Sequence, residues 1–90
     1  MLMIKSRSIL GSKICIDFVI YLYKEQKTNV FNSSLELRRT YCHMNNVVNF
    51  LDKEHITSSI KNGRNRFVTL TEKGKRITEH LMEIQREELY

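Results

Sequence analysis

Three asparagines within five residues are the part of this sequence with the most readable chemistry. Asn45, Asn46 and Asn49 lie in one short segment with His43 before them and Lys53 after them. The apolar residues of that segment recur at i, i+3, i+4 and i+7, the spacing of one helical face: Met44, Val47, Val48 and Leu51. If that face packs on a core, the amides lie on the opposite face, where an asparagine can bond bidentately to an adenine edge.

The same asparagines also have a plainer interpretation. Asparagine is a poor helix former: each one destabilises a helix by a few tenths of a kcal/mol relative to alanine, roughly 0.5 kcal/mol at a typical position. Three on one face of a short helix therefore suggest a function, and we predict contacts with nucleic-acid bases. A merely solvated helix face stays open as the alternative.

Positive charge is concentrated in one stretch of the chain. Residues 61–76 carry six basic side chains and one acidic one, a net charge of +5: Lys61, Arg64, Arg66, Lys73, Lys75 and Arg76 against Glu72. After residue 76, four glutamates outnumber one arginine. We expect Arg64 and Arg66 to project from a hairpin tip into a minor groove or onto the backbone. Lys73, Lys75, Arg38 and Arg39 are expected to hold phosphates, although a simply solvated hairpin remains possible.

Composition supports an anionic partner and gives little support to catalysis. Fifteen lysines and arginines against ten acidic residues give +5 and a pI near 9.4. The carboxylates lie on separate predicted elements, the three histidines are scattered, and the glycines form no phosphate-binding motif. Cys15 is expected in the core, and Cys42 next to His43 lacks further metal ligands. We predict no enzyme activity, no cofactor and no metal.

The length and the apolar pattern bound the architecture. Ninety residues predict a single domain, 1–90, that is only marginally stable alone, so dimerisation is a natural way to add stability. No stretch approaches the roughly 18 to 20 apolar residues that span a bilayer. The amino-terminal segment also lacks the pattern of a secretory signal. We therefore expect a cytoplasmic protein without a membrane partner.

The first expected element is a helix over residues 12–26 with Ser12 as its cap. It is apolar on two sides: Ile14, Phe18, Tyr21 and Leu22 on one, and Ile16, Val19, Ile20 and Tyr23 on the other. A buried strand is the alternative, but length and flanking charges favour a helix. Residues 29–32 are expected to be a connection. Ser33 and Glu36 fit a capping box that starts a second helix at Ser33 or Ser34.

That second helix is expected to end around Cys42, where the asparagine-bearing helix follows, so residues 33–54 form a helix-turn-helix candidate. Residues 56–61 and 66–71 alternate in character around Asn62-Gly63, which predicts a β-hairpin over 56–71. Residues 72–90 are expected to form a last helix. Its apolar seam of Ile77, Leu81 and Ile84 could face the core or a partner helix.

The order helix, helix, helix, hairpin, helix carries a resemblance to known proteins. The segment IKNGRNRFVTLTEKGKRI resembles the wing and exit of MarR, PadR and ArsR-like regulators, and MNNVVNFLDKEHIT resembles their recognition helix. SSLELRR is similar to the preceding helix, so the resemblance covers about residues 12–81. One departure is His55, which precedes Ile56 where these families usually have a glycine-containing exit with one residue more. The sequence also looks like small archaeal or archaeal-virus winged-helix proteins.

The resemblance implies an α+β, mainly helical fold: a winged helix-turn-helix with a two-stranded wing and a C-terminal helix. It implies a homodimeric transcriptional regulator that binds double-stranded DNA sequence-specifically. The expected DNA-binding residues are Arg38, Arg39, His43, Asn45, Asn46, Asn49, Lys53, Lys61, Arg64, Arg66 and Lys73. The expected dimer interface comprises Ile16, Ile20, Tyr23, Ile77, Leu81 and Ile84.

Three other functions stay open for such a fold. A sequence-tolerant architectural DNA binder would show little preference between sequences, and a protein-interaction module would bind DNA weakly even at low salt. An ArsR-type sensor is disfavoured because the sequence lacks a clustered cysteine or carboxylate site.

Overall fold

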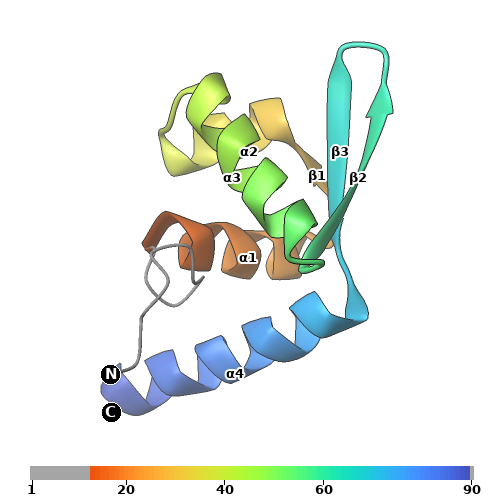
Figure 1. The fold of residues 1–90 in the computed structure, drawn as a ribbon. Helices are drawn as coiled ribbons and strands as arrows, with labels where there is room; N and C mark the ends of the chain where they lie inside the picture. The colour runs from red at the N-terminus through yellow and green to blue at the C-terminus, as the bar shows by residue number, and fades with distance from the viewer. Residues whose placement is uncertain (1–12, 90) are drawn as a thin grey trace, which may run out of the picture.

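The computed structural model describes residues 13–89. In order along the chain they form α1 (Lys13–Glu25), β1 (Thr28–Asn29), α2 (Val30–Leu37), α3 (Tyr41–Lys53), β2 (Thr57–Asn62), β3 (Asn65–Leu70) and α4 (Glu72–Leu89). The strands make one antiparallel sheet in the order β1-β3-β2. In Figure 1, α1 lies between α4 and the α2–α3 pair, and the β2–β3 hairpin projects beyond the helices. The predicted mainly helical α+β fold is confirmed.

The first helix, α1, is apolar on two sides, and both sides are covered by other elements. Phe18, Val19 and Leu22 of α1 are completely buried, and Cys15 is buried beside them as predicted. The helices α2 and α3 contribute to the same core, and α4 packs along α1 from the other side. The helix prediction is therefore confirmed and the strand alternative is wrong. The expected Ser12 cap lies outside the described residues.

The predicted start of the second helix is wrong. α2 begins at Val30, with Asn29 as its N-cap, whose side-chain Oδ1 accepts a hydrogen bond from the Asn32 backbone N–H at 2.7 Å. Ser33 and Ser34 lie inside the helix, buried, and their hydroxyls donate to the carbonyls three residues earlier. The capping-box pattern was misleading because serine hydroxyls can bond to the backbone within a helix as well as at its start.

The turn between α2 and α3 is also earlier than predicted. α2 ends at Leu37 rather than around Cys42, because Arg38 takes a left-handed conformation with φ 56°. The Arg39 N–H then donates to the Ser34 carbonyl at 2.9 Å, which closes the helix end. Thr40 caps α3 by accepting a hydrogen bond from the His43 N–H at 3.1 Å. Three residues, 38–40, thus form the turn of the helix-turn-helix.

The inner face of α3 agrees with the sequence pattern. All four residues at the predicted helical spacing are buried: Met44, Val47, Val48 and Leu51. Because this face is fixed on the core, the polar positions of α3 must lie outside it or along the edge that meets the hairpin.

His55 forms the corner at the end of α3, where the sequence departs from the families it resembles. Its φ is +62°, its N–H donates to the Asp52 carbonyl, and the Ile56 N–H donates to the Leu51 carbonyl, both at 3.0 Å. This pair of bonds is the Schellman arrangement that commonly uses glycine. Histidine is among the residues that enter the left-handed region more readily than most. His55 therefore makes a sharp backbone turn at this corner without a glycine.

The hairpin is confirmed, and each strand runs one residue further toward the tip than predicted, to Asn62 and from Asn65. Asn62 pairs with Asn65, so Gly63 and Arg64 form the two-residue loop. Gly63 has φ +66° at the first loop position, where two-residue hairpins often need glycine. A further strand, β1, was not predicted: residues 28 and 29, expected to lie before or within a connection, pair with Val68 and Phe67 of β3.

The LTEKG segment joins α4 to the corner after α3. The Thr71 hydroxyl oxygen accepts a hydrogen bond from the Gly74 N–H at 3.0 Å and lies 2.7 Å from the His55 carbonyl oxygen, to which it donates. The Thr71 N–H donates to the Ile56 carbonyl at 3.1 Å. Gly74 is buried so tightly here that an added Cβ would lie 2.1 Å from the Ile56 carbonyl oxygen. The start of α4 is therefore fixed against the end of α3.

Candidate nucleic-acid interface

The outer face of α3 carries most of the polar residues that the sequence singled out. His43, Asn46, Asn49 and Lys53 are exposed on it, whereas Asn45 is half-buried. This face is opposite the four buried apolar residues of the helix. The structure thus brings the predicted base-reading residues onto one exposed helical surface, beside the projecting hairpin (Figure 1).

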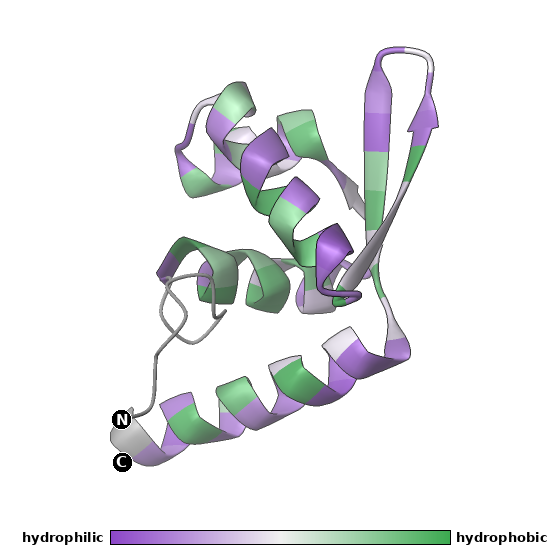
Figure 2. Ribbon diagram, in the orientation of Figure 1, coloured by the Kyte–Doolittle hydropathy of each residue, from purple (hydrophilic) through white to green (hydrophobic). Residues whose placement is uncertain are grey.

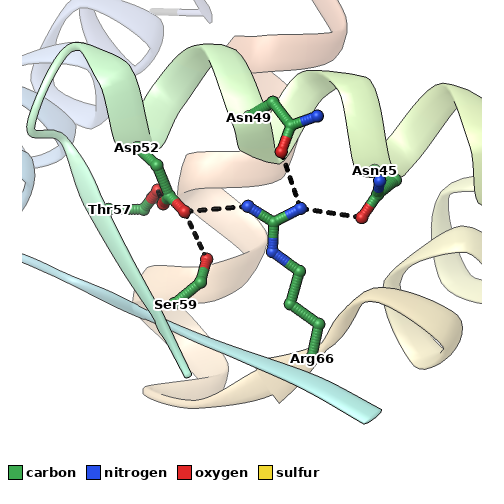
Figure 3. A network of polar contacts seen from close by, with 6 residues as sticks. All are labelled: Asn45, Asn49, Asp52, Thr57, Ser59 and Arg66. Carbon is green, nitrogen blue, oxygen red and sulfur yellow. Dashed lines mark hydrogen bonds and ion pairs between the residues drawn. The ribbon is translucent and has the colours of Figure 1, made fainter. Parts of the chain in front are cut away.

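A polar network joins this surface to the hairpin (Figure 3). The Arg66 guanidinium, reaching from β3, donates through one nitrogen to Oδ1 of Asn45 and Oδ1 of Asn49, each at 2.8 Å. Its second terminal nitrogen lies 2.9 Å from Oδ2 of Asp52. Asn45, Asn49 and Asp52 occupy positions i, i+4 and i+7 of α3, so one guanidinium bridges three side chains along one edge of the helix.

The carboxylate in this network is held by the hairpin as well. Asp52 accepts hydrogen bonds from the hydroxyls of Thr57 and Ser59 on β2, the second at 2.6 Å. The Arg66 side chain is 14% exposed and that of Asp52 is 25% exposed. An ion pair of this kind with several hydrogen bonds is more constrained than a surface pair. We call these six residues the Arg66 network: Asn45, Asn49, Asp52, Thr57, Ser59 and Arg66.

The expected orientation of Arg66 is therefore wrong. The sequence placed it at the hairpin tip with Arg64, projecting toward a groove or a phosphate. In the structure its side chain turns back onto α3, because three acceptors of that helix lie within reach. Asp52 was not among the predicted site residues, because its partners are separated from it along the chain and only the fold brings them together.

Two other basic residues of the hairpin do project. Lys61, opposite Arg66 in the register, and Arg64 in the loop are both exposed. Figure 2 shows the distal part of the hairpin as mainly hydrophilic. The tip therefore presents positive charge at a distance from the core.

The remaining predicted phosphate contacts are spread over two corners. Arg38 and Arg39 are exposed in the turn before α3, as expected for the helix-turn-helix. Lys73 is exposed near the start of α4, but its Nζ donates to the Glu54 carbonyl at 3.0 Å. Lys75 lies 3.8 Å from a Glu72 oxygen, an exposed pair that contributes little to stability. Lys73 thus has a structural partner at the end of α3.

The residues predicted for a dimer interface are partly used within the chain. Leu81 is only 6% exposed and belongs to the core, and Ile16 and Ile77 pack against that core. Of the two roles left open for the seam of the last helix, Ile77 and Leu81 serve the core, as does Ile16 of α1, because α1 and α4 pack on each other. Ile20 is half-buried, whereas Ile84, one turn beyond Leu81, is 55% exposed.

Tyr23, the last of these residues, also has a partner on α4. Its hydroxyl donates to a Glu79 carboxylate oxygen at 2.8 Å. This hydrogen bond to a carboxylate, with smaller contributions from desolvation and from the nearby negative charge, raises the pKa of Tyr23 above its ordinary value. This hydrogen bond therefore connects α1 to α4 in addition to their packing on each other.

Within residues 13–89, no group of three or more histidine, cysteine or carboxylate side chains is placed to hold a metal ion. None of the described helices is long and apolar enough to cross a membrane.

Known structures share this arrangement, although neither a scan of protein-family models nor a search of curated proteins found a match. A transcriptional regulator homologue from Pyrococcus horikoshii superposes with a TM-score of 0.79 at 15% identity, over 90% of this chain and 84% of that one. MepR of Staphylococcus aureus in its DNA complex gives 0.76 at 17% identity, over 84% and 59% of the two chains.

A third similar structure is FabT of Streptococcus pneumoniae in complex with DNA. Its TM-score is 0.78 at 17% identity, over 90% of this chain and 63% of that one. At such identities the agreement concerns the fold. The described chain has the winged-helix fold of the transcriptional regulators that its sequence resembles, with α2 and α3 as the helix-turn-helix and β2–β3 as the wing.

Proposed function

We propose that this protein binds double-stranded DNA at specific sites and acts as a transcriptional regulator. The observation that carries the proposal is the exposed outer face of α3, with Asn46 and Asn49 on it, beside a wing that presents Lys61 and Arg64. A major groove admits an α-helix, and amide side chains can read its base edges. The similar MepR and FabT structures, which were solved with DNA, support the same use of the fold.

The two parts of this surface would do different work. With α3 in the major groove, Asn46 and Asn49 would face bases, and Arg38 and Arg39 before the helix would lie near the phosphates. Arg64 at the wing tip would contact the adjoining backbone or minor groove. Base contacts set sequence preference, whereas phosphate contacts set affinity and its dependence on salt.

We further propose that the protein works as a homodimer in the cytoplasm. Because Leu81 belongs to the core, the proposal relies on Ile84 of α4, which is 55% exposed. Pairing of two α4 helices through this part would cover it. A twofold axis would then place two α3 helices on half-sites about 34 Å apart, one turn of DNA.

Two alanine substitutions test the proposal, since they remove different kinds of contact. Asn46→Ala is well suited because Asn46 is exposed and lies outside the Arg66 network. It should lower discrimination between the best site and a mismatched site by roughly 1 kcal/mol or more, about fivefold to tenfold. Arg64→Ala should weaken binding to both duplexes equally and make the salt dependence shallower by about one charge.

A sequence-tolerant architectural binder is the second candidate, and one observation favours it. The carbonyl oxygens of Asn45 and Asn49 already accept hydrogen bonds from Arg66, which restricts their use in bidentate contacts with adenine. In that case Asn46→Ala would leave the ratio of the two affinities unchanged, while Arg64→Ala would still weaken both.

A further inference from the structure

The Arg66 network constrains how Asn49 can read a base. A guanidinium carries donors only, so the atom that each asparagine turns toward Arg66 must be its carbonyl oxygen. Figure 3 shows the Asn49 oxygen facing Arg66 and the amide nitrogen directed away from it. Asn49 is exposed, so its –NH₂ group is available to a ligand on the outer face of α3.

We propose that Arg66 is a positioning residue that makes Asn49 a hydrogen-bond donor toward keto bases in DNA. This inference rests on the proposed function and names the base class that α3 prefers at one position. A donor can pair with the keto oxygens, guanine O6 and thymine O4, where adenine N6 and cytosine N4 present donors instead. The contact must be to the keto oxygen, because N7 is an acceptor in both guanine and adenine and does not distinguish them. The bidentate adenine contact also needs the asparagine oxygen, which Arg66 occupies from the side. Asn49 should therefore favour guanine or thymine over adenine or cytosine on the strand it contacts.

The network holds Arg66 firmly enough for this role. Its second terminal nitrogen is paired with Asp52 at 2.9 Å, and Asp52 in turn accepts from Thr57 and Ser59 of the wing. Asn45 receives a third bond from the guanidinium at 2.8 Å. Four residues besides Asn49 thus hold the guanidinium directly or through Asp52, so the amide is oriented before DNA arrives and no ordering is needed on binding.

The test selects duplexes from a randomised pool and then measures affinities with each base at the Asn49 position. Wild-type protein should bind the keto base about threefold to tenfold more tightly than the amino base, the effect of one hydrogen bond. Arg66→Met should remove that preference, since the amide can then turn over, and Arg66→Lys should restore part of it. Arg64→Ala is the matched control: a wing arginine outside the network whose loss should leave the preference intact.

A second variant does not depend on the stability of the Arg66 mutants. Asn49→Asp keeps the side-chain shape and replaces the donor with an acceptor, so the preference should invert toward cytosine or adenine. With wild-type protein, 7-deazaguanine at the same position should leave binding unchanged, because the keto oxygen and not N7 is the acceptor.

Three results would overturn the inference. One is a wild-type preference for adenine or cytosine at the Asn49 position, and another is an unchanged preference in Arg66→Met. The third is a uniform loss of affinity in Arg66→Met with a shallower salt dependence, which would make Arg66 a phosphate contact. If wild-type protein shows no preference at any position, or binds no DNA, the proposed function itself fails, and that outcome is seen before any variant is compared.

Discussion

Among the residues at the start of α4, Gly74 should tolerate an added methyl group least. In Gly74→Ala the new Cβ would lie 2.1 Å from the Ile56 carbonyl oxygen, where real Cβ atoms stay beyond 3.0 Å, so the backbones must separate by at least 0.9 Å. Such overpacking costs about 1–3 kcal/mol. The same movement strains the Thr71 bonds to the corner after α3, worth about 1 kcal/mol each.

Alanine's better helix propensity offsets this cost by about 1 kcal/mol. We therefore expect Gly74→Ala to lower the free energy of unfolding by about 2–3 kcal/mol, or the melting temperature by about 10 °C or more. Urea denaturation followed by circular dichroism measures this directly.

Gly63→Ala is the matched control for that experiment. Gly63 has φ +66° but open space around its Cα, so alanine there costs about 1–2 kcal/mol of backbone strain without a clash. We expect it to be less destabilised than Gly74→Ala. If Gly74→Ala is as stable as the wild type, the close approach of α4 to the α3 corner does not exist in solution and the reasoning is refuted.

Three further predictions concern other parts of the fold. Leu81→Ala should lower the free energy of unfolding by about 2–5 kcal/mol at any protein concentration, since Leu81 is in the core. Ile84→Ala, by contrast, should change the oligomeric state in sedimentation experiments and leave the monomer fold intact. Asp52→Ala should loosen the wing, visible as faster amide exchange in β2, because Thr57 and Ser59 lose their acceptor. Because the pKa of Tyr23 is raised, its hydrogen bond to Glu79 stabilises the fold below about pH 10 and is lost as the pH rises through the raised value. The melting temperatures of Tyr23→Phe and wild type should therefore converge at alkaline pH.

The elements with a strong repeating pattern were predictable from sequence. The buried face of α3 follows from four apolar residues at helical spacing, and the hairpin follows from alternating strands around Gly63. Hydrophobic periodicity works here because burial of one face determines how the element is oriented.

The start of α2 and the strand β1 could not be predicted in the same way. A strand of two residues, Thr28–Asn29, is too short to show alternation, and it forms only because β3 is there to pair with it. Ser33 and Glu36 matched a capping pattern, but Asn29 is the N-cap and Ser33 lies buried inside the helix. Tertiary packing overrides local propensity at such positions.

The exposed surface of the candidate site was predictable from sequence, but the hydrogen bonds of the Arg66 network were not. The exposed positions of α3 and the charge of the wing tip follow from sequence. The pairing of Arg66 with Asn45, Asn49 and Asp52 spans 14 to 21 positions along the chain and depends on how closely the wing approaches α3. A sequence shows that an arginine is near a hairpin tip but does not show which way its side chain turns.

The most direct test of the central claim is fluorescence anisotropy of the purified wild-type protein on the DNA upstream of its own coding sequence and on a scrambled duplex. Each is titrated at several salt concentrations, because phosphate contacts alone make binding steeply salt-dependent. We predict at least about a hundredfold tighter binding to the upstream DNA at physiological salt, within the range of site-specific proteins. Equal affinities for the two duplexes, or no binding even at low salt, would contradict the assignment as a site-specific DNA-binding regulator.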